Sequence, residues 1–197
     1  MKRLLTLALI VGNVCWGSVL WQDDFTDAQI QVGGGTNSLN FGTYLRALAI
    51  ENPYGLPPIE TKSEIGGGSW DITNGVGDNA TYRLWYDWLG ANTPIPAGAT
   101  NIEVWVAIIG SDGNESQIKL GGIGSGAAII PENSLDLLYA FPGTPGGKLT
   151  FEVTGEDGFD LAIDRVYITG DIAEVPEPAT YAMVGAGLLA LAFRRRG

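Results

Sequence analysis

The chain of 197 residues predicts an all-β fold, an antiparallel β-sandwich. Its central part is rich in Gly, Thr, Val, Ile, Tyr and Trp and has no long segment with helical periodicity. Short apolar runs alternate with turn sequences such as Gly66-Gly67-Gly68, Asn74-Gly75 and Pro145-Gly146-Gly147. Short strands at regular spacing with turn residues between them are typical of sandwiches and barrels.

Three segments alternate apolar and polar residues along their length: 81–89, 101–109 and 148–154. This period of two is typical of strands with one buried face and one wet face. The predicted core residues of these strands are Tyr82, Leu84, Tyr86, Trp88, Ile102, Val104, Val106, Ile108, Leu149, Phe151 and Val153.

Further strands are predicted at 19–25, 41–50, 117–123, 135–141 and 161–169. The last of these breaks phase, because its apolar residues lie at 161 and 163 and then at 166 and 168. A β-bulge at Asp164-Arg165 would restore a single apolar face. Segment 51–70 contains Pro53, Pro57 and Pro58, and we expect a long excursion there rather than a paired central strand.

Strands of this number around one core fit an antiparallel jelly roll best, with an immunoglobulin-like sandwich as the alternative. The first predicted strand contains Asp23-Asp24-Phe25, and the last contains Ile163-Asp164-Arg165-Val166. These strands resemble the jelly-roll modules of bacterial extracellular proteins, carbohydrate-binding modules among them. The resemblance rests on the strand pattern.

The N-terminus has the three parts of a secretory signal peptide. Lys2 and Arg3 precede the apolar residues 4–11, and small residues then allow cleavage between Gly17 and Ser18. We therefore expect a signal helix in residues 1–17 that is removed on export. The sandwich domain is predicted to span 18–171.

The C-terminus has a fixed order of elements, which begins with a linker at 172–178 that contains a Pro-Glu-Pro element. Pro176-Glu177-Pro178 is followed by an uncharged apolar run over 179–193, and then by Arg194, Arg195 and Arg196. A helix over this run would be about 22 Å long, shorter than the ~30 Å hydrocarbon core of a bilayer. Snorkelling arginines can cover the difference, so we expect a transmembrane helix in 179–197 with its arginines in the cytoplasm.

This tail closely resembles the PEP-CTERM sorting signal of Gram-negative bacteria. The resemblance implies an exosortase-type membrane protease as partner, which cleaves near Pro176-Glu177-Pro178 after a transient stay in the membrane. It implies export through the inner membrane to the cell envelope, the cell surface or the extracellular matrix. In this family the cargo is commonly linked to exopolysaccharide and the biofilm matrix. The alternative is an ordinary tail anchor.

Composition excludes several kinds of site. The chain has no histidine, and its one cysteine, Cys15, leaves with the signal peptide. No disulfide, thiol nucleophile or cysteine-bound zinc is then possible, and the commonest general base is missing. The formal charge is −11, and it is −16 without Lys2, Arg3 and the three tail arginines. Such an acidic domain does not bind nucleic acid by counterion release.

Carboxylates are the remaining candidates for site chemistry. A jelly roll places its first and last strands side by side, so Asp23 or Asp24 can meet Asp160 or Asp164 in a structural Ca²⁺ site. A glycosidase would need such a pair, or Glu156 with Asp157, in a cleft. We expect hydrated loop acids instead, with no enzymatic activity and no cofactor other than this possible Ca²⁺.

Trp85 and Trp105 point away from the predicted core, beside Arg83 and Asp87. If their strands share a sheet, the two indoles form a flat platform on which sugar rings stack. The alternative is that loops such as 51–70 cover both rings. The sequence thus predicts an exported, non-enzymatic structural protein of the cell surface or matrix, with a carbohydrate-binding module for extracellular polysaccharide as the alternative.

Overall fold

The computed structural model describes residues 18–51, 61–75, 80–89, 92–155 and 158–172. The predicted signal peptide, the Pro-Glu-Pro element and the apolar tail lie outside these residues. Among the residues that are described, no helix has the length and apolar character needed to cross a membrane.

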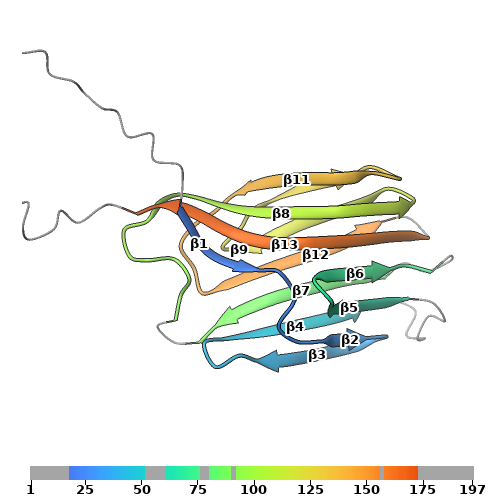
Figure 1. Ribbon diagram of the computed structural model, residues 1–197, viewed down its shortest axis with the longest axis horizontal. Coiled ribbons are helices and arrows are strands. Elements are labelled where there is room, and N and C mark those ends of the chain that lie inside the picture. The colour runs from blue at the N-terminus through green and yellow to red at the C-terminus, as the bar shows by residue number, and fades with distance from the viewer. Residues whose placement is uncertain (1–17, 52–60, 76–79, 90–91, 156–157, 173–197) are drawn as a thin grey trace, which may run out of the picture.

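Two antiparallel sheets form the fold (Figure 1). The seven-stranded sheet runs in the order β11 (Leu135–Pro142), β8 (Thr100–Gly113), β13 (Phe159–Asp171), β6 (Ser69–Thr73), β5 (Lys62–Gly66), β2 (Ile30–Val32). Its seventh strand, β1 (Ser18–Asp23), also pairs with β13. The six-stranded sheet runs in the order β10 (Gly126–Ile130), β9 (Ser116–Gly122), β12 (Lys148–Gly155), β7 (Thr81–Trp88), β4 (Tyr44–Glu51), β3 (Gly35–Asn40).

The order of the last strands is that of a jelly roll. From β6 onward, one sheet reads β6-β13-β8-β11 and the other reads β7-β12-β9-β10. The chain crosses between the sheets at most of its connections, which is the double Greek key of this architecture. The jelly-roll prediction is confirmed, and the immunoglobulin-like alternative is wrong. Strands β2 to β5 extend both sheets beyond this unit.

Strand β13 is bent by the predicted bulge. Its register with β8 shifts between Ile163 and Arg165, so Asp164 has no partner in the ladder. Before the bulge Leu161 and Ile163 face the core, and after it Val166 and Ile168 do. The edge of β13 changes partner at the same place: β6 pairs with residues 160–163, and β1 pairs with residues 166–170.

The core lies between the sheets, as the alternation predicts. All of the predicted core residues of β7, β8 and β12 are less than a tenth exposed. They meet residues such as Phe25, Ile65 and Trp70, which join the same hydrophobic cluster. Each fully buried aliphatic or aromatic side chain contributes about 1.5–3 kcal/mol relative to an exposed one, so this cluster stabilises the sandwich.

The expectation for segment 51–70 is wrong over its second half. The prolines at 53, 57 and 58 lie outside the described residues, but the chain then forms the hairpin of β5 and β6. Strand β6 is a central strand, paired with β5 on one side and β13 on the other. The prolines end before Lys62, so they remove no hydrogen-bond donor from this hairpin.

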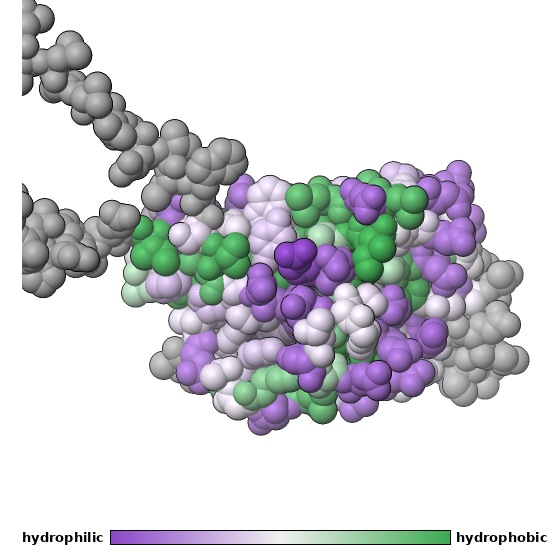
Figure 2. All heavy atoms as spheres, in the orientation of Figure 1, coloured by the Kyte–Doolittle hydropathy of each residue, from purple (hydrophilic) through white to green (hydrophobic). Residues whose placement is uncertain are grey.

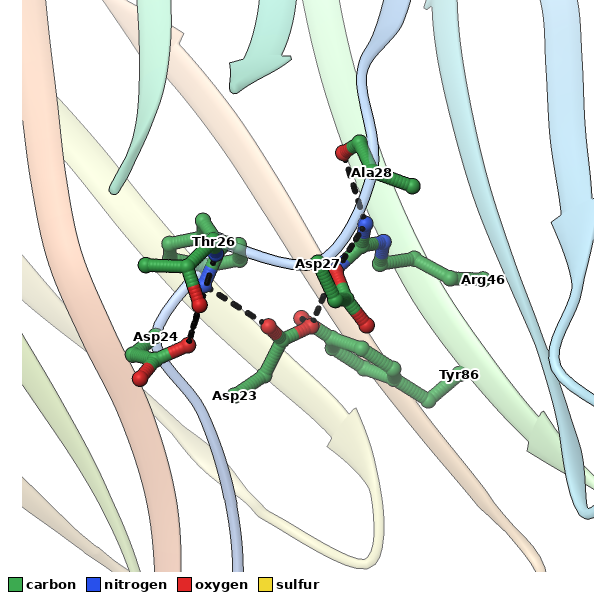
Figure 3. Close-up of polar contacts among 8 residues, drawn as sticks. Asp23, Asp24, Thr26, Asp27, Ala28, Arg46 and Tyr86 are labelled. Atoms are coloured by element: carbon green, nitrogen blue, oxygen red, sulfur yellow. Dashed lines mark hydrogen bonds and ion pairs between the residues drawn. The ribbon is translucent and has the colours of Figure 1, made fainter. Parts of the chain in front are cut away.

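A buried ion pair connects the two sheets at the end of β1 (Figure 3). The Arg46 side chain in β4 is fully buried, and its Nη1 lies 2.7 Å from Asp23 Oδ2. Its Nη2 donates to Asp27 Oδ1 at 2.9 Å and to the carbonyl oxygen of Ala28 at 3.1 Å. The Tyr86 hydroxyl of β7 donates to Asp23 Oδ2 at 2.8 Å. A buried charge is tolerated only when it is paired and hydrogen-bonded in this way.

The turn after β1 is shaped by the same carboxylate. The backbone N–H of Phe25 donates to Asp23 Oδ1 at 2.8 Å. Phe25 has a φ of 59°, in the left-handed region that side chains rarely occupy, and its ring is fully buried. The Asp23 contacts and the burial of the ring therefore offset the backbone strain of this residue.

We expect Asp23→Asn to lower the free energy of unfolding by about 3 kcal/mol, because it leaves the buried guanidinium of Arg46 with one charged partner fewer. Urea unfolding of the full chain in mild detergent measures the change. The matched control is Asp24→Asn, whose exposed carboxylate bonds only locally to Thr26, and which we expect to change stability by less than about 0.5 kcal/mol. Equal losses in both variants would contradict the role of the ion pair.

Burial raises the pKa of Tyr44 to about 12, and the negative charges of Asp23 and Asp27 act in the same direction. Burial also raises the pKa of the fully buried Tyr86 well above its usual value. From about pH 10 upward the unfolded chain loses phenolic protons that the folded chain keeps. The free energy of unfolding of the protein therefore falls as the pH rises. We expect a smaller decline between pH 9 and 11 when both tyrosines are replaced by Phe. If the free energy of unfolding, measured with urea at each pH, declines as steeply in this variant as in the wild type, other groups cause the decline.

Candidate functional site

Trp85 and Trp105 lie in different sheets. Trp85 belongs to β7 of the six-stranded sheet and Trp105 to β8 of the seven-stranded sheet, so the predicted common platform does not form. Both side chains are half-buried. They are not covered by the described part of segment 51–70, which forms strands instead. The parity of the two residues was predicted correctly, but the sheet to which each strand belongs was not visible in the sequence.

Trp105 has another aromatic partner. Tyr167 of β13 is its direct neighbour across the ladder, and the two ring planes are parallel within 1° with centroids 5.8 Å apart. The indole Nε1–H donates to Thr169 Oγ1 at 3.1 Å, which fixes the orientation of the ring. We name Trp105 and Tyr167 the aromatic pair.

The bulge in β13 is the reason that Tyr167 faces outward. Without it, the alternation set by Leu161 and Ile163 would place residue 167 in the core. The same phase break in the sequence therefore identifies Tyr167 as an outward aromatic residue. Tyr167 was not among the residues predicted for the site, although this break in phase indicates its outward direction.

The aromatic pair lies in a hollowed surface on the outer face of the seven-stranded sheet. One hollow of about 760 Å³ contains both rings. A second hollow of about 660 Å³ adjoins it and shares Leu138 and Tyr167 with it. Both volumes are in the range of ligand sites in proteins. We name the two hollows together the groove.

The floor of the groove is apolar and its rim is polar. Across the sheet, Ala140, Trp105, Tyr167 and Gln22 form one row on β11, β8, β13 and β1. Ile109 and Leu138, which line the second hollow, are about half exposed. Figure 2 shows hydrophobic residues gathered in the upper part of the view, where Figure 1 has β11 and β8. Such a floor can bind the apolar face of a flat ring.

Polar groups at one end of the groove are held by hydrogen bonds. Asn101 Nδ2 donates to Asp171 Oδ2 at 2.6 Å, and Asn101 adopts a φ of 49° at the start of β8. Glu103, which lies opposite Thr169 in the ladder between β8 and β13, is exposed. These side chains can accept or donate hydrogen bonds at the rim.

Trp85 has a different environment on the six-stranded sheet. Lys148 Nζ lies 5.8 Å from the centroid of its ring, in cation–π contact. Arg83 is paired with Glu152 at 3.0 Å and with Glu51. Asp87 is exposed. Of the two side chains predicted to hydrogen-bond a sugar beside Trp85, Arg83 is thus already engaged with Glu152 and Glu51.

The four carboxylates of the expected calcium site have different partners in the structure. Strands β1 and β13 do lie side by side, as predicted. Asp23, however, points into the sandwich toward Arg46, whereas Asp24 is exposed and bonds to Thr26, which lowers its pKa. Asp164 lies 3.4 Å from Arg165, and Asp160 pairs across the ladder with Thr73 and Asp112.

Among the described residues, no three side chains of the metal-binding types His, Cys, Asp and Glu come together. Glu156 and Asp157, the other carboxylate pair considered, lie outside them. The sequence could not reveal the separation, because it depends on which side of β1 each aspartate occupies at the turn.

The C-terminal residues match a family model described as the PEP-CTERM protein-sorting motif, over residues 174–196. The chain carries a PEP-CTERM sorting signal. The match confirms the prediction made from Pro176, Glu177, Pro178 and the arginines at 194–196. A chain with this signal is exported and sorted at the membrane. A search of curated proteins finds no match.

Several solved structures resemble the sandwich. One, described as BiXyn10A CBM1 in its apo form, is 13% identical, with a TM-score of 0.42 over 78% of this chain and 99% of that one. A family 29 carbohydrate-binding module is 14% identical, with a TM-score of 0.36 over 68% and 97%. TmCBM61, solved with β-1,4-galactotriose, is 10% identical, with a TM-score of 0.35 over 69% and 87%. Likenesses this distant assign no role to any residue.

Proposed function

We propose that this chain is an exported, non-catalytic protein whose jelly-roll domain binds extracellular polysaccharide in the groove. The observation that carries the proposal is the aromatic pair, two parallel rings set in an open hollow and fixed by a hydrogen bond to Thr169. The two half-buried rings adjoin the exposed side chain of Leu138, and a contiguous apolar patch of this kind marks a binding site more often than scattered apolar residues do.

The groove fits the chemistry of a sugar chain. The C–H faces of sugar rings are apolar and stack on aromatic side chains, while their hydroxyls need hydrogen-bonding partners. Trp105, Tyr167 and Leu138 supply the apolar floor. Gln22 and Asn101 supply neutral polar groups at its edges. The two adjoining hollows give room for more than one sugar ring.

A non-catalytic role agrees with the described carboxylates. Glycoside hydrolysis needs two carboxyl groups about 5–10 Å apart in a cleft, one of them with a raised pKa. Asp23 is engaged in a buried ion pair, and the pKa of Asp24 is lowered rather than raised. Neither Asp23 nor Asp24 is therefore a candidate general acid, and binding without cleavage is part of our proposal.

The sorting signal supplies the place of action. We propose that an exosortase-type membrane protease cleaves the tail near Pro176-Glu177-Pro178 and that the domain then joins the cell surface or biofilm matrix of a Gram-negative bacterium. The first and last described residues, Ser18 and Ile172, lie at the same end of the sandwich (Figure 1), since Ser18 pairs with Gly170. Both terminal segments therefore leave the domain from the same end.

We expect Trp105→Ala to weaken polysaccharide binding by at least about 30-fold, because the loss of a central aromatic contact costs about 2 kcal/mol or more. Affinity electrophoresis of the full chain, in a zwitterionic detergent without a sugar head group, measures the retardation over a panel of soluble polysaccharides. Trp85→Ala is the matched control, since it removes a half-buried tryptophan from the opposite face. Circular dichroism checks that both variants keep the fold.

Unchanged migration of the wild type over the whole panel would contradict glycan binding. It would leave a purely structural role in the matrix, in which the domain is displayed and binds no sugar. Equal loss of retardation in both tryptophan variants would contradict the groove as the site.

We expect the mature protein to lack its C-terminal tail. Mass spectrometry of the protein isolated from its host should find no peptide that covers residues 188–193, because cleavage near the Pro-Glu-Pro element removes them. Replacing Pro176, Glu177 and Pro178 by Ala should restore such peptides in the membrane fraction. An intact C-terminus in the wild type would indicate a simple tail anchor instead.

A further inference from the structure

The charges around the groove are almost all negative. Four carboxylates line its two hollows: Glu103 and Asp171 in one, Asp136 and Asp164 in the other. Arg165 is the single cation among the described lining residues, and it lies 3.4 Å from Asp164. The groove therefore presents a net negative rim around an apolar floor.

The other face of the sandwich does not share this imbalance. On the six-stranded sheet, Lys119 and Arg83 both pair across the ladder with Glu152. Lys148 similarly pairs with Asp87 and lies over Trp85. Each of these three basic residues thus has an acidic residue opposite it in the ladder. The negative charge of the groove is therefore a property of this face of the sandwich. It does not result only from the acidic composition of the whole chain.

A negative rim distinguishes classes of polysaccharide by their charge. Uronic acid or sulfated chains bring negative groups next to these carboxylates and are repelled, and a neutral chain is unaffected. A chain with free amino groups brings ammonium ions that form charge-assisted hydrogen bonds with carboxylates. An ammonium ion is also attracted to the faces of aromatic rings such as those of Trp105 and Tyr167.

We propose that the groove binds an amino-sugar polysaccharide, one in which part of the amino groups are free and protonated. This inference rests on the proposed function, since it assigns the ligand class of the same site. The aromatic pair holds the sugar rings, and Glu103 at the rim of the larger hollow pairs with an ammonium group. Glu103 is the better partner for an ammonium group because it is exposed, whereas the Asp171 carboxylate already accepts a hydrogen bond from Asn101.

The test compares oligosaccharides that share one backbone. Glucosamine oligomers with free amines, the same oligomers fully N-acetylated, and oligogalacturonate as an acidic chain are titrated into the full chain by calorimetry below pH 6. We expect the free-amine oligomer to bind about tenfold more tightly than the N-acetylated one, and the acidic oligomer to bind weakest. The preference should shrink as salt rises from 50 to 300 mM, since exposed charges are screened.

Two variants separate the site from general charge attraction. Glu103→Gln should remove most of the preference for free amines, because it lowers the affinity for the free-amine oligomer far more than the affinity for the N-acetylated one. Glu64→Gln, in β5 of the same sheet and outside both hollows, should change neither. Trp105→Ala should weaken the binding of both the free-amine and the N-acetylated oligomer.

The outcomes distinguish this inference from the proposed function. Equal affinity for the free-amine and N-acetylated oligomers would overturn the inference and leave glycan binding intact. Free-amine binding that survives Trp105→Ala, or that Glu64→Gln lowers as much as Glu103→Gln, would also overturn it, because the attraction would then come from the net charge of the chain. No binding of any oligomer, here and on the wider panel, would overturn both.

Discussion

The buried contact between Arg46 and Asp23 is the interaction on which the candidate site depends. It fixes the end of β1 against β4 and β7 of the opposite sheet, with the Tyr86 hydroxyl as a third member. Desolvating these charges is costly, so the contact contributes geometry more than net stability. Strand β1, once placed, covers the edge of β13 over residues 166–170, beyond the end of its pairing with β6.

This placement connects the interior of the sandwich to its outer surface. Gln22 pairs across the ladder with Tyr167 only because β1 continues the sheet there. The bulge at Asp164 turns Tyr167 outward, next to Trp105. The groove is therefore the consequence of two local irregularities, a bulge in the last strand and a late-joining first strand. Bulges often redirect side chains in this way at functional sites.

The two faces of the sandwich have different surfaces. The seven-stranded face has an apolar floor with unbalanced acids, and the six-stranded face has paired charges around a single tryptophan. The sorting signal sends the chain to the membrane and outward.

The sequence alone determined the sorting signal, the fold class, the core face of each long strand and the bulge. These depend on local order: a charge-apolar-charge sequence, or a period of two. The tertiary structure decided which strands share a sheet, and so it separated Trp85 from Trp105 and joined Trp105 to Tyr167. It also decided which aspartate at the first turn points inward, since Asp23 and Asp24 are equivalent in the sequence but only Asp23 reaches Arg46. Pairing between distant strands is set by packing of the whole chain, which no local pattern encodes.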